Sequence, residues 1–141
     1  MNSHITEATY YTKSVGIALL ATFAAYVINK VSHNSKTRVV NSLFSPVIEE
    51  LLKTLLAQLF AASILLVHTA FGIVEAIIDA RRSKRPSATA GLAVATHIMF
   101  GVVTVLGWRY FSICAGISAS VLLHMLWNSF IYDLVNLQRK D

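Results

Sequence analysis

The chain has 141 residues, of which 55% are hydrophobic and only 13% are charged. Its mean hydropathy of +0.61 is too high for a soluble domain of this length, so residues 1–141 are expected to form one integral membrane domain. The formal charge of +5 comes from basic clusters between apolar runs, which indicates contact with a lipid bilayer and argues against nucleic acid as a partner.

The first apolar run covers residues 14–30 and follows a polar start. A signal peptide is typically marked by a basic region before the run and a small-residue cleavage site after it, and neither is convincing here. We therefore expect a retained transmembrane helix at 14–30, followed by a polar, basic connection over 30–43.

The next apolar region, residues 46–80, contains one glycine and no proline after Pro46. A straight helix of that length would run about 50 Å, whereas the hydrocarbon core of a bilayer is about 30 Å thick. The chain is therefore expected to fold back, with its softest point at Phe60-Ala61-Ala62-Ser63, so that a second arm covers 64–80.

Two further apolar runs, 88–106 and 112–135, follow the basic loop 81–86. Gly107-Trp108-Arg109-Tyr110 mixes aromatic and basic side chains, as membrane interfaces do, and is expected to form the turn between the two runs. The predicted fold is therefore all-α, a polytopic membrane bundle of about five transmembrane helices.

Basic residues are distributed unevenly between the two ends of these helices. With five crossings and an external N-terminus, nine basic residues fall on one side and two, Lys13 and Arg109, fall on the other. Because cytoplasmic loops are enriched in basic residues, the side with nine, and with it the C-terminus, is expected to be cytoplasmic. The nine are Lys30, Lys36, Arg38, Arg81, Arg82, Lys84, Arg85, Arg139 and Lys140.

The stretch from Ser45 to Lys53 places three charges at the head of an apolar run. One interpretation is structural: Ser45 and Pro46 suit a helix N-terminus, and Lys53 follows Glu49 at the spacing of a helical ion pair. The other interpretation is functional, because ionisable groups inside a membrane are costly and usually mark a site. The residues of this stretch alone leave both interpretations open.

Ionisable residues lie at matching distances on either side of the predicted turns. Glu75 and His97 are each eleven residues from Pro86. Glu49 and Glu75 are likewise equally far from residue 62, and His97 and His124 are nearly equally far from the turn at 109–110. At about 1.5 Å of rise per residue, equal distances mean equal depths. Asn128 follows His124 by four residues, so it shares a helical face with the imidazole and is expected to orient it. The set expected at one depth, in the cytoplasmic half of the bilayer, is Glu49, Glu50, Glu75, His97 and His124.

Two imidazoles with one or two carboxylates match a catalytic zinc site, in which three protein ligands leave one position for water. We expect zinc or another divalent metal on His97, His124 and Glu75, with a further carboxylate as general base. Each residue alone also has a structural interpretation, because a single buried histidine is usually a hydrogen-bonded packing element. His68 is interpreted as structural for this reason.

Four motifs follow one another along the chain. They are Glu49-Glu50-Leu51-Leu52-Lys53, Phe71-Gly72-Ile73-Val74-Glu75, His97-Ile98-Met99-Phe100 and Leu123-His124-Met125-Leu126-Trp127-Asn128. In this order they resemble the motifs of PrsW-type intramembrane proteases, which are related to the CAAX-processing and bacteriocin-processing proteases and to the Aph-1 subunit of gamma-secretase. The resemblance covers about residues 44–130, so 44–135 is expected to be a protease-like helical core and the first helix lies outside it.

The resemblance implies a helical membrane peptidase in which paired glutamates activate water and histidines bind metal or stabilise the reaction intermediate. The chain departs from the family in two respects: Ala76 stands where members often have asparagine, and the chain is shorter than most members. The catalytic site that the resemblance implies consists of Glu49, Glu50, Glu75, His97, His124 and Asn128.

The expected function is hydrolysis of peptide bonds in membrane-anchored protein substrates, in the plasma membrane of a prokaryote and with the active site on the cytoplasmic side. Glu50 is the expected general base, because Glu49 is better placed to pair with Lys53. Two other classes stay open. One is a non-catalytic scaffold or immunity-type membrane protein on the same fold, and the other is a haem protein with His97 and His124 as iron ligands.

Overall fold

The computed structural model describes residues 3–32, 43–81 and 86–137, and within these ranges the chain is helical apart from short turns. The predicted all-α fold is therefore confirmed. The described ranges contain five helices, which are α1 (Ser3–Ser32), α2 (Ser45–Leu59), α3 (Ile64–Ala80), α4 (Pro86–Tyr110) and α5 (Ile113–Leu137). The basic residues at 33–42, 82–85 and 138–141 were predicted to lie in cytoplasmic connections and the tail, and they fall outside the described residues.

The predicted fold-back is confirmed, because α2 and α3 are separated by residues 60–63. Ala61 in this turn takes the left-handed conformation with a φ of 47°, which is strained for most residues other than glycine. The Ser63 hydroxyl then accepts a hydrogen bond from the backbone N–H of Leu66 at 3.3 Å. This bond caps the start of α3 and so fixes where the second arm begins.

Two predicted boundaries are wrong. The helix expected at 14–30 begins at Ser3, because the polar residues before position 14 continue it for about three turns. The turn expected at 107–110 lies at 111–112. Gly107 instead sits inside α4, where a side-chain carbon would come within 2.5 Å of the Gly116 Cα on α5, so this glycine serves a close helix contact.

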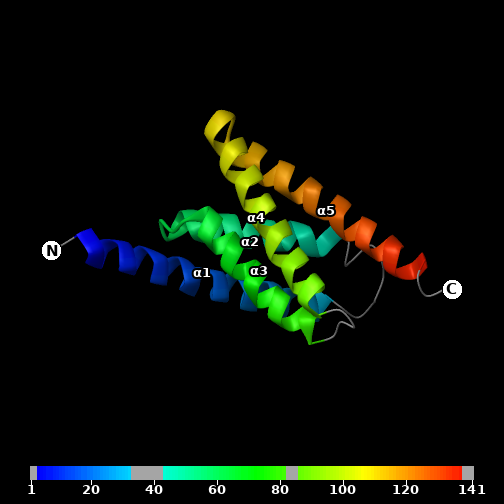
Figure 1. Cartoon of the computed structure of the whole chain (residues 1–141). Coiled ribbons are helices and arrows are strands. Elements are labelled where there is room, and N and C mark those ends of the chain that lie inside the picture. Colours follow the sequence, from blue (N-terminus) through cyan, green and yellow to red (C-terminus); the bar gives the residue numbers. More distant parts are fainter. Residues whose placement is uncertain (1–2, 33–42, 82–85, 138–141) are drawn as a thin grey trace.

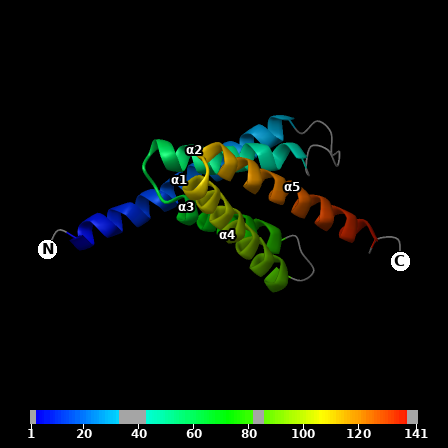
Figure 2. The same ribbon diagram turned by 90° about the horizontal axis from the view of Figure 1, so that it is seen from above.

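Successive helices run in opposite directions, and α3 and α4 make the most extensive contact (Figure 1). α1 packs on α2 and α3, while α5 packs on α4 and on α2, which carries the paired glutamates. The start of α1 and the α2–α3 turn lie at one end of the bundle, and the end of α5 and the start of α2 lie at the other (Figure 2). The four helices that carry the predicted site residues therefore form one contiguous group.

The interior of the bundle holds polar and charged side chains beside its apolar core, and many large apolar side chains are exposed on its outside, most clearly on α2. The outward face of α2 exposes leucines, with Leu59 at 75% and Leu55 at 52% exposure. Charged groups that point inward and apolar groups that point outward fit a lipid surrounding rather than water. The buried stripe of α2 recurs every three or four residues and consists of Pro46, Glu49, Glu50, Lys53, Thr54 and Ala57.

Among the described residues, three helices are long and apolar enough to cross a membrane, over Glu7–Lys30, Ser87–Tyr110 and Ile113–Leu134. The helices α2 and α3 have 15 and 17 residues and are therefore shorter, about 22 and 25 Å at 1.5 Å of rise per residue. The structure is thus compatible with an integral membrane protein in which the two shorter helices carry the carboxylates of the predicted site.

Candidate functional site

Glu50 lies at the centre of the site. Its carboxylate accepts hydrogen bonds from Lys53 on the same helix, from Nδ1 of His124 at 2.9 Å and from the Ser120 hydroxyl at 2.5 Å. Glu50, Lys53 and Ser120 are all fully buried. A buried carboxylate is tolerated when it is paired with a cation and hydrogen-bonded, and both conditions are met here.

Lys53 extends this network from α2 to α4 and α3. Its ammonium donates to Nδ1 of His97 at 3.1 Å and lies 4.6 Å from the ring centre of Phe71. Because an ammonium can only donate, His97 accepts at Nδ1 and carries its proton on Nε2, which donates to Glu75 at 2.5 Å. The ion pair, the imidazole and the second carboxylate therefore form one chain of hydrogen bonds with a defined direction.

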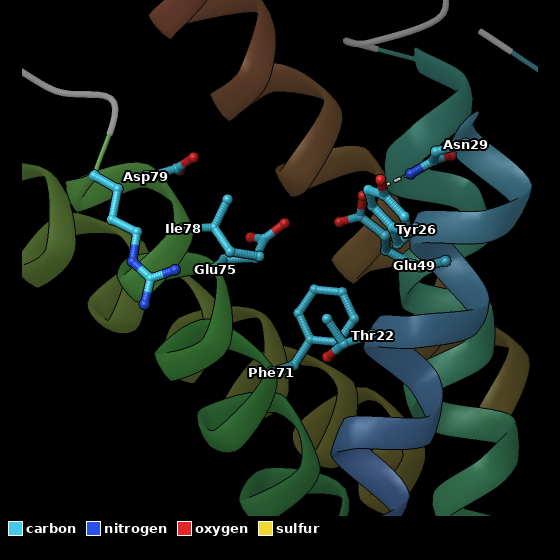
Figure 3. Close-up of a pocket in the computed structure, with 10 residues that line it drawn as sticks. Thr22, Tyr26, Asn29, Glu49, Phe71, Glu75, Ile78 and Asp79 are labelled. Atoms are coloured by element: carbon cyan, nitrogen blue, oxygen red, sulfur yellow. Dashed lines mark hydrogen bonds between the residues drawn. The ribbon is translucent and has the colours of Figure 1, made fainter.

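Glu49 lines a cavity of about 430 Å³ between α1 and α3, and Glu50 is not among the residues that line it (Figure 3). Asn29 on α1 donates a hydrogen bond to its carboxylate at 3.3 Å. Glu75, whose side chain is 33% exposed, faces Glu49 from the other wall of the cavity. Glu49 thus combines an amide partner with direct access to a space that can hold part of a substrate.

His124 lies between the two neighbouring glutamates. Its Nδ1 donates to Glu50, while its Nε2 lies 3.9 Å from Oε2 of Glu49, which is too long for a direct hydrogen bond. The ring stacks on Phe100 with the centroids 4.5 Å apart and 22° between the planes. A neutral imidazole that donates at Nδ1 keeps a free lone pair on Nε2, on the side of Glu49.

The structure brings together the five ionisable residues that were predicted to share one depth. Asn128, the sixth predicted residue, is half-buried one turn beyond His124 on α5. The hydrogen bond from Nδ1 of His124 is accepted by Glu50. An orienting contact from Asn128 to this imidazole stays a prediction. The hydrogen bonds and short contacts described above connect Glu49, Glu50, Glu75, His97 and His124.

One predicted pairing is wrong. Lys53 pairs with Glu50, three residues earlier, rather than with Glu49, four residues earlier. Glu50 was expected to be the general base because Lys53 was expected to pair with Glu49, and the observed Lys53–Glu50 pair does not support that role. Glu50 is the enclosed carboxylate, whereas Glu49 is the one that lines the cavity.

Sequence reasoning missed two residues that contact Glu50. Ser120 precedes His124 by four residues and so shares its helical face, which is a signal that pointed to it. His68 was interpreted as structural, yet it is fully buried with its Nδ1 only 3.6 Å from Oε2 of Glu50. The site therefore includes side chains from α1, α2, α3, α4 and α5.

The predicted metal ligands do not surround a common point in this arrangement. Nε2 of His97 and the Glu75 carboxylate are 2.5 Å apart, whereas two ligands of one tetrahedral zinc ion lie about 3.3 Å apart. Nδ1 of His97 faces the Lys53 ammonium, and in the described part of the chain no three His, Cys, Asp or Glu side chains are arranged to hold a metal ion. The divalent metal stays a prediction, and none of the steps below depends on it.

The resemblance to PrsW-type proteases rests on four short motifs, and their ionisable residues converge in the folded chain. Membership of that family stays a prediction. Comparison of the whole chain with protein-family models, with curated proteins and with solved structures yields no match.

Proposed function

We propose that this chain is an intramembrane endopeptidase that hydrolyses peptide bonds of membrane-anchored protein substrates. One observation carries the proposal: the two adjacent glutamates occupy different environments. Glu50 is enclosed and paired with Lys53. Glu49 faces a cavity and lies beside the unprotonated nitrogen of His124. A structural ion pair needs only one carboxylate, so the second, open to a cavity, is available as a base.

Glu49 and His124 are spaced to hold one water molecule between them. Oε2 and Nε2 are 3.9 Å apart, and a water that donates one hydrogen to each at about 2.8 Å fits that separation. Glu49 takes a proton from this water as the water oxygen attacks the carbonyl carbon of the substrate, and the proton then passes to the leaving amine. The role of general base is thus assigned to Glu49 in place of Glu50.

The inner residues hold the reacting pair in position. Glu50 accepts from Nδ1 of His124 and so keeps Nε2 unprotonated on the side of the water. Lys53 neutralises Glu50, which lowers the cost of a second charged carboxylate nearby. His97, anchored by Lys53, holds Glu75 at the opposite wall of the cavity, where a carboxylate can receive N–H groups of a bound peptide.

New peptide termini test the proposal. Membranes from cells that produce the wild-type chain or the Glu49→Gln variant are compared by mass spectrometry for newly formed N-termini. We expect termini within or beside hydrophobic segments that depend on the wild-type chain and vanish with Glu49→Gln, because an amide cannot take a proton from water. Equal sets of termini in the two samples would contradict the proposal and favour the scaffold class.

Two measurements on purified protein separate the metal and haem alternatives. A divalent ion on His97, His124 and Glu75 predicts metal that co-purifies with the wild-type chain and is lost in His124→Ala. A haem between the two histidines predicts a Soret absorption band, but both ring nitrogens of His97 already contact protein side chains. The hydrolytic steps above use neither group.

We further propose a plasma-membrane location, in a prokaryote, with the cavity on the cytoplasmic side. The cavity is lined by Asn29 near the end of α1 and by Asp79 and Arg81 at the end of α3, next to the basic ends of these helices. Basic residues are enriched on the cytoplasmic side of membrane proteins. A reporter fused after Lys84 should therefore read as cytoplasmic, and an external reading would contradict this orientation.

A further inference from the structure

A short pattern occurs twice, once on each of the two helices in most extensive contact. α3 carries His68-Thr69-Ala70-Phe71-Gly72 and α4 carries His97-Ile98-Met99-Phe100-Gly101, so both read His-x-x-Phe-Gly. Both phenylalanines are buried, at 1% and 0% exposure. The two helices run in opposite directions, so the glycine of each copy meets the histidine end of the other (Figure 1).

Each glycine makes room for the histidine of the other copy. A side-chain carbon on Gly72 would come within 2.7 Å of the His97 Cβ, and one on Gly101 would come within 2.9 Å of the His68 Cβ. Such distances are too short for real Cβ atoms, so each helix receives the imidazole of the other over bare backbone. The reciprocal contacts give the two histidines equivalent positions at the helix crossing.

The two imidazoles meet opposite ends of one ion pair. Nδ1 of His97 lies 3.1 Å from the Lys53 ammonium, and Nδ1 of His68 lies 3.6 Å from Oε2 of Glu50. Both histidines are enclosed, at 2% and 0% exposure. The same ring nitrogen therefore faces the cation in one copy of the pattern and the carboxylate in the other.

Nδ1 of His68 is a buried group that the proposed mechanism leaves unexplained. It has no hydrogen-bond partner within bonding distance among the described residues, whereas Nε2 lies 3.5 Å from the Thr54 hydroxyl. Buried polar atoms in native proteins almost always have a partner. Oε2 of Glu50 is an acceptor 3.6 Å from Nδ1 of His68, and a small decrease in this distance would make it a hydrogen bond.

We propose that His68 is a positioning residue of this site, a neutral imidazole that is protonated at Nδ1 and donates to Oε2 of Glu50. Oε2 then accepts from His68 and Ser120, while Oε1 accepts from Lys53 and His124. Two donors on each oxygen fill the hydrogen-bonding capacity of a carboxylate. Glu50 is thereby fixed to α3 and α5 as well as to Lys53 on its own helix. The consequence for catalysis rests on the proposed function, but the hydrogen bond itself does not.

The tautomers of the two equivalent histidines test the proposal directly. In purified full-length protein with ¹⁵N-labelled histidine, nitrogen shifts distinguish rings protonated at Nδ1, at Nε2 or at both. We expect His68, assigned by its absence in His68→Asn, to be protonated at Nδ1 alone and His97 at Nε2 alone. An Nε2-protonated or cationic His68 would overturn the proposal.

Thr54→Val is the matched control, because it removes the hydroxyl on the other side of the His68 ring. We expect His68 to keep its proton on Nδ1 in this variant, since Glu50 is unchanged. A switch of the proton to Nε2 would mean that Thr54 sets the tautomer, and this outcome would overturn the role assigned to Glu50.

Two variants at position 68 separate a hydrogen-bonding role from a packing role. His68→Asn keeps an N–H group near the position of Nδ1, whereas His68→Phe keeps the ring and loses the donor. The ¹³C resonance of the Glu50 carboxylate, assigned by its loss in Glu50→Gln, should move in His68→Phe and stay near its wild-type position in His68→Asn. Equal shifts in both variants would show packing alone and overturn the proposal.

Activity separates this inference from the peptidase proposal. Where the wild-type chain cleaves membrane substrates, His68→Phe should lower the rate about tenfold or more, and His68→Asn should restore most of it. Equal rates in the two variants would overturn the positioning role. A wild-type chain that cleaves nothing while His68 is protonated at Nδ1 would end the peptidase proposal and leave the His68–Glu50 hydrogen bond established.

Discussion

Glu49 and Glu50 are neighbours in the sequence and occupy contrasting environments. Glu50 is 0% exposed and is held by a cation, an imidazole and a hydroxyl group. Glu49 is 7% exposed, lines a cavity and receives an amide hydrogen bond from Asn29. Successive helical residues point about 100° apart, so one rigid helix can direct one carboxylate to the core and the next to the cavity.

The contrast between Glu49 and Glu50 shows that charged residues in one membrane helix can have a structural role or a chemical role. An enclosed ion pair fixes how neighbouring helices pack, whereas a carboxylate beside a cavity stays accessible to water and substrate. On this account, Glu50 and Lys53 hold the bundle together and Glu49 transfers the proton. Variants of the two glutamates should therefore separate stability from activity.

Glu50→Ala should have the largest effect on stability. It leaves the Lys53 ammonium buried without its carboxylate, and loss of one partner of a buried ion pair costs about 3–5 kcal/mol of unfolding free energy. Glu49→Ala should cost about 1 kcal/mol, as expected for one ordinary hydrogen bond. Denaturant unfolding of both variants in one detergent measures the difference, and equal losses would remove the distinction between the glutamates.

Glu49→Gln should have the largest effect on catalysis. A general base contributes about 10²–10⁴-fold, so cleavage should fall by about 100-fold or more. The amide retains the size of the side chain and an acceptor for Asn29, so the unfolding free energy should change by less than about 1 kcal/mol. Rates and unfolding curves from the same preparation check both statements, and full activity would return the base role to Glu50.

Glu75→Gln should have an intermediate effect, because it weakens the hydrogen-bonded chain without breaking it. The Nε2 donor of His97 keeps an acceptor but loses the assistance of a full charge, worth about 1 kcal/mol. Cleavage should therefore fall about fivefold. Glu75→Ala leaves the His97 N–H without this acceptor and should lower the rate further, so a milder effect in Glu75→Ala would contradict the account.

Asn29→Ala should have the smallest effect of the four. It removes a 3.3 Å hydrogen bond to Glu49 from a half-buried position, so the rate should fall less than about fivefold. Asn29→Asp places a second carboxylate beside Glu49 and should be more harmful. Rate measurements on the two variants test this order, and complete loss in Asn29→Ala would make α1 part of the catalytic machinery.

Depth was the property of the site that the sequence could predict. The rise per residue of a helix is nearly constant, so counting from the turns placed the five ionisable residues at one level. The misplaced turn at 107–110 did little harm, because His97 and His124 lie 14 and 12 residues from the true turn at 111–112, so their depths differ by only about 3 Å. The fold-back at 60–63 was equally predictable, from the mismatch between helix length and bilayer thickness.

The depth of a residue in the membrane does not determine the direction in which its side chain points, so the pairing of these side chains could not be predicted. Lys53 has acids three and four residues before it, and both spacings favour a helical ion pair. Tertiary packing decides between them, because Ser120 and His124 approach α2 on the side of Glu50. The shared His-x-x-Phe-Gly pattern was likewise visible in the sequence, but its meaning depends on α3 and α4 crossing with each glycine against a histidine.

Incorporation of ¹⁸O tests the central claim most directly. Purified wild-type chain, Glu49→Gln and Glu50→Gln are each reconstituted with a membrane-protein extract in H₂¹⁸O, and new peptide C-termini are read by mass spectrometry. Because hydrolysis adds one water oxygen to the new carboxyl group, the wild-type sample should contain termini that carry one ¹⁸O atom and are absent with Glu49→Gln. No such termini in the wild-type sample, or the same termini with Glu49→Gln, would contradict hydrolysis by a water that Glu49 activates.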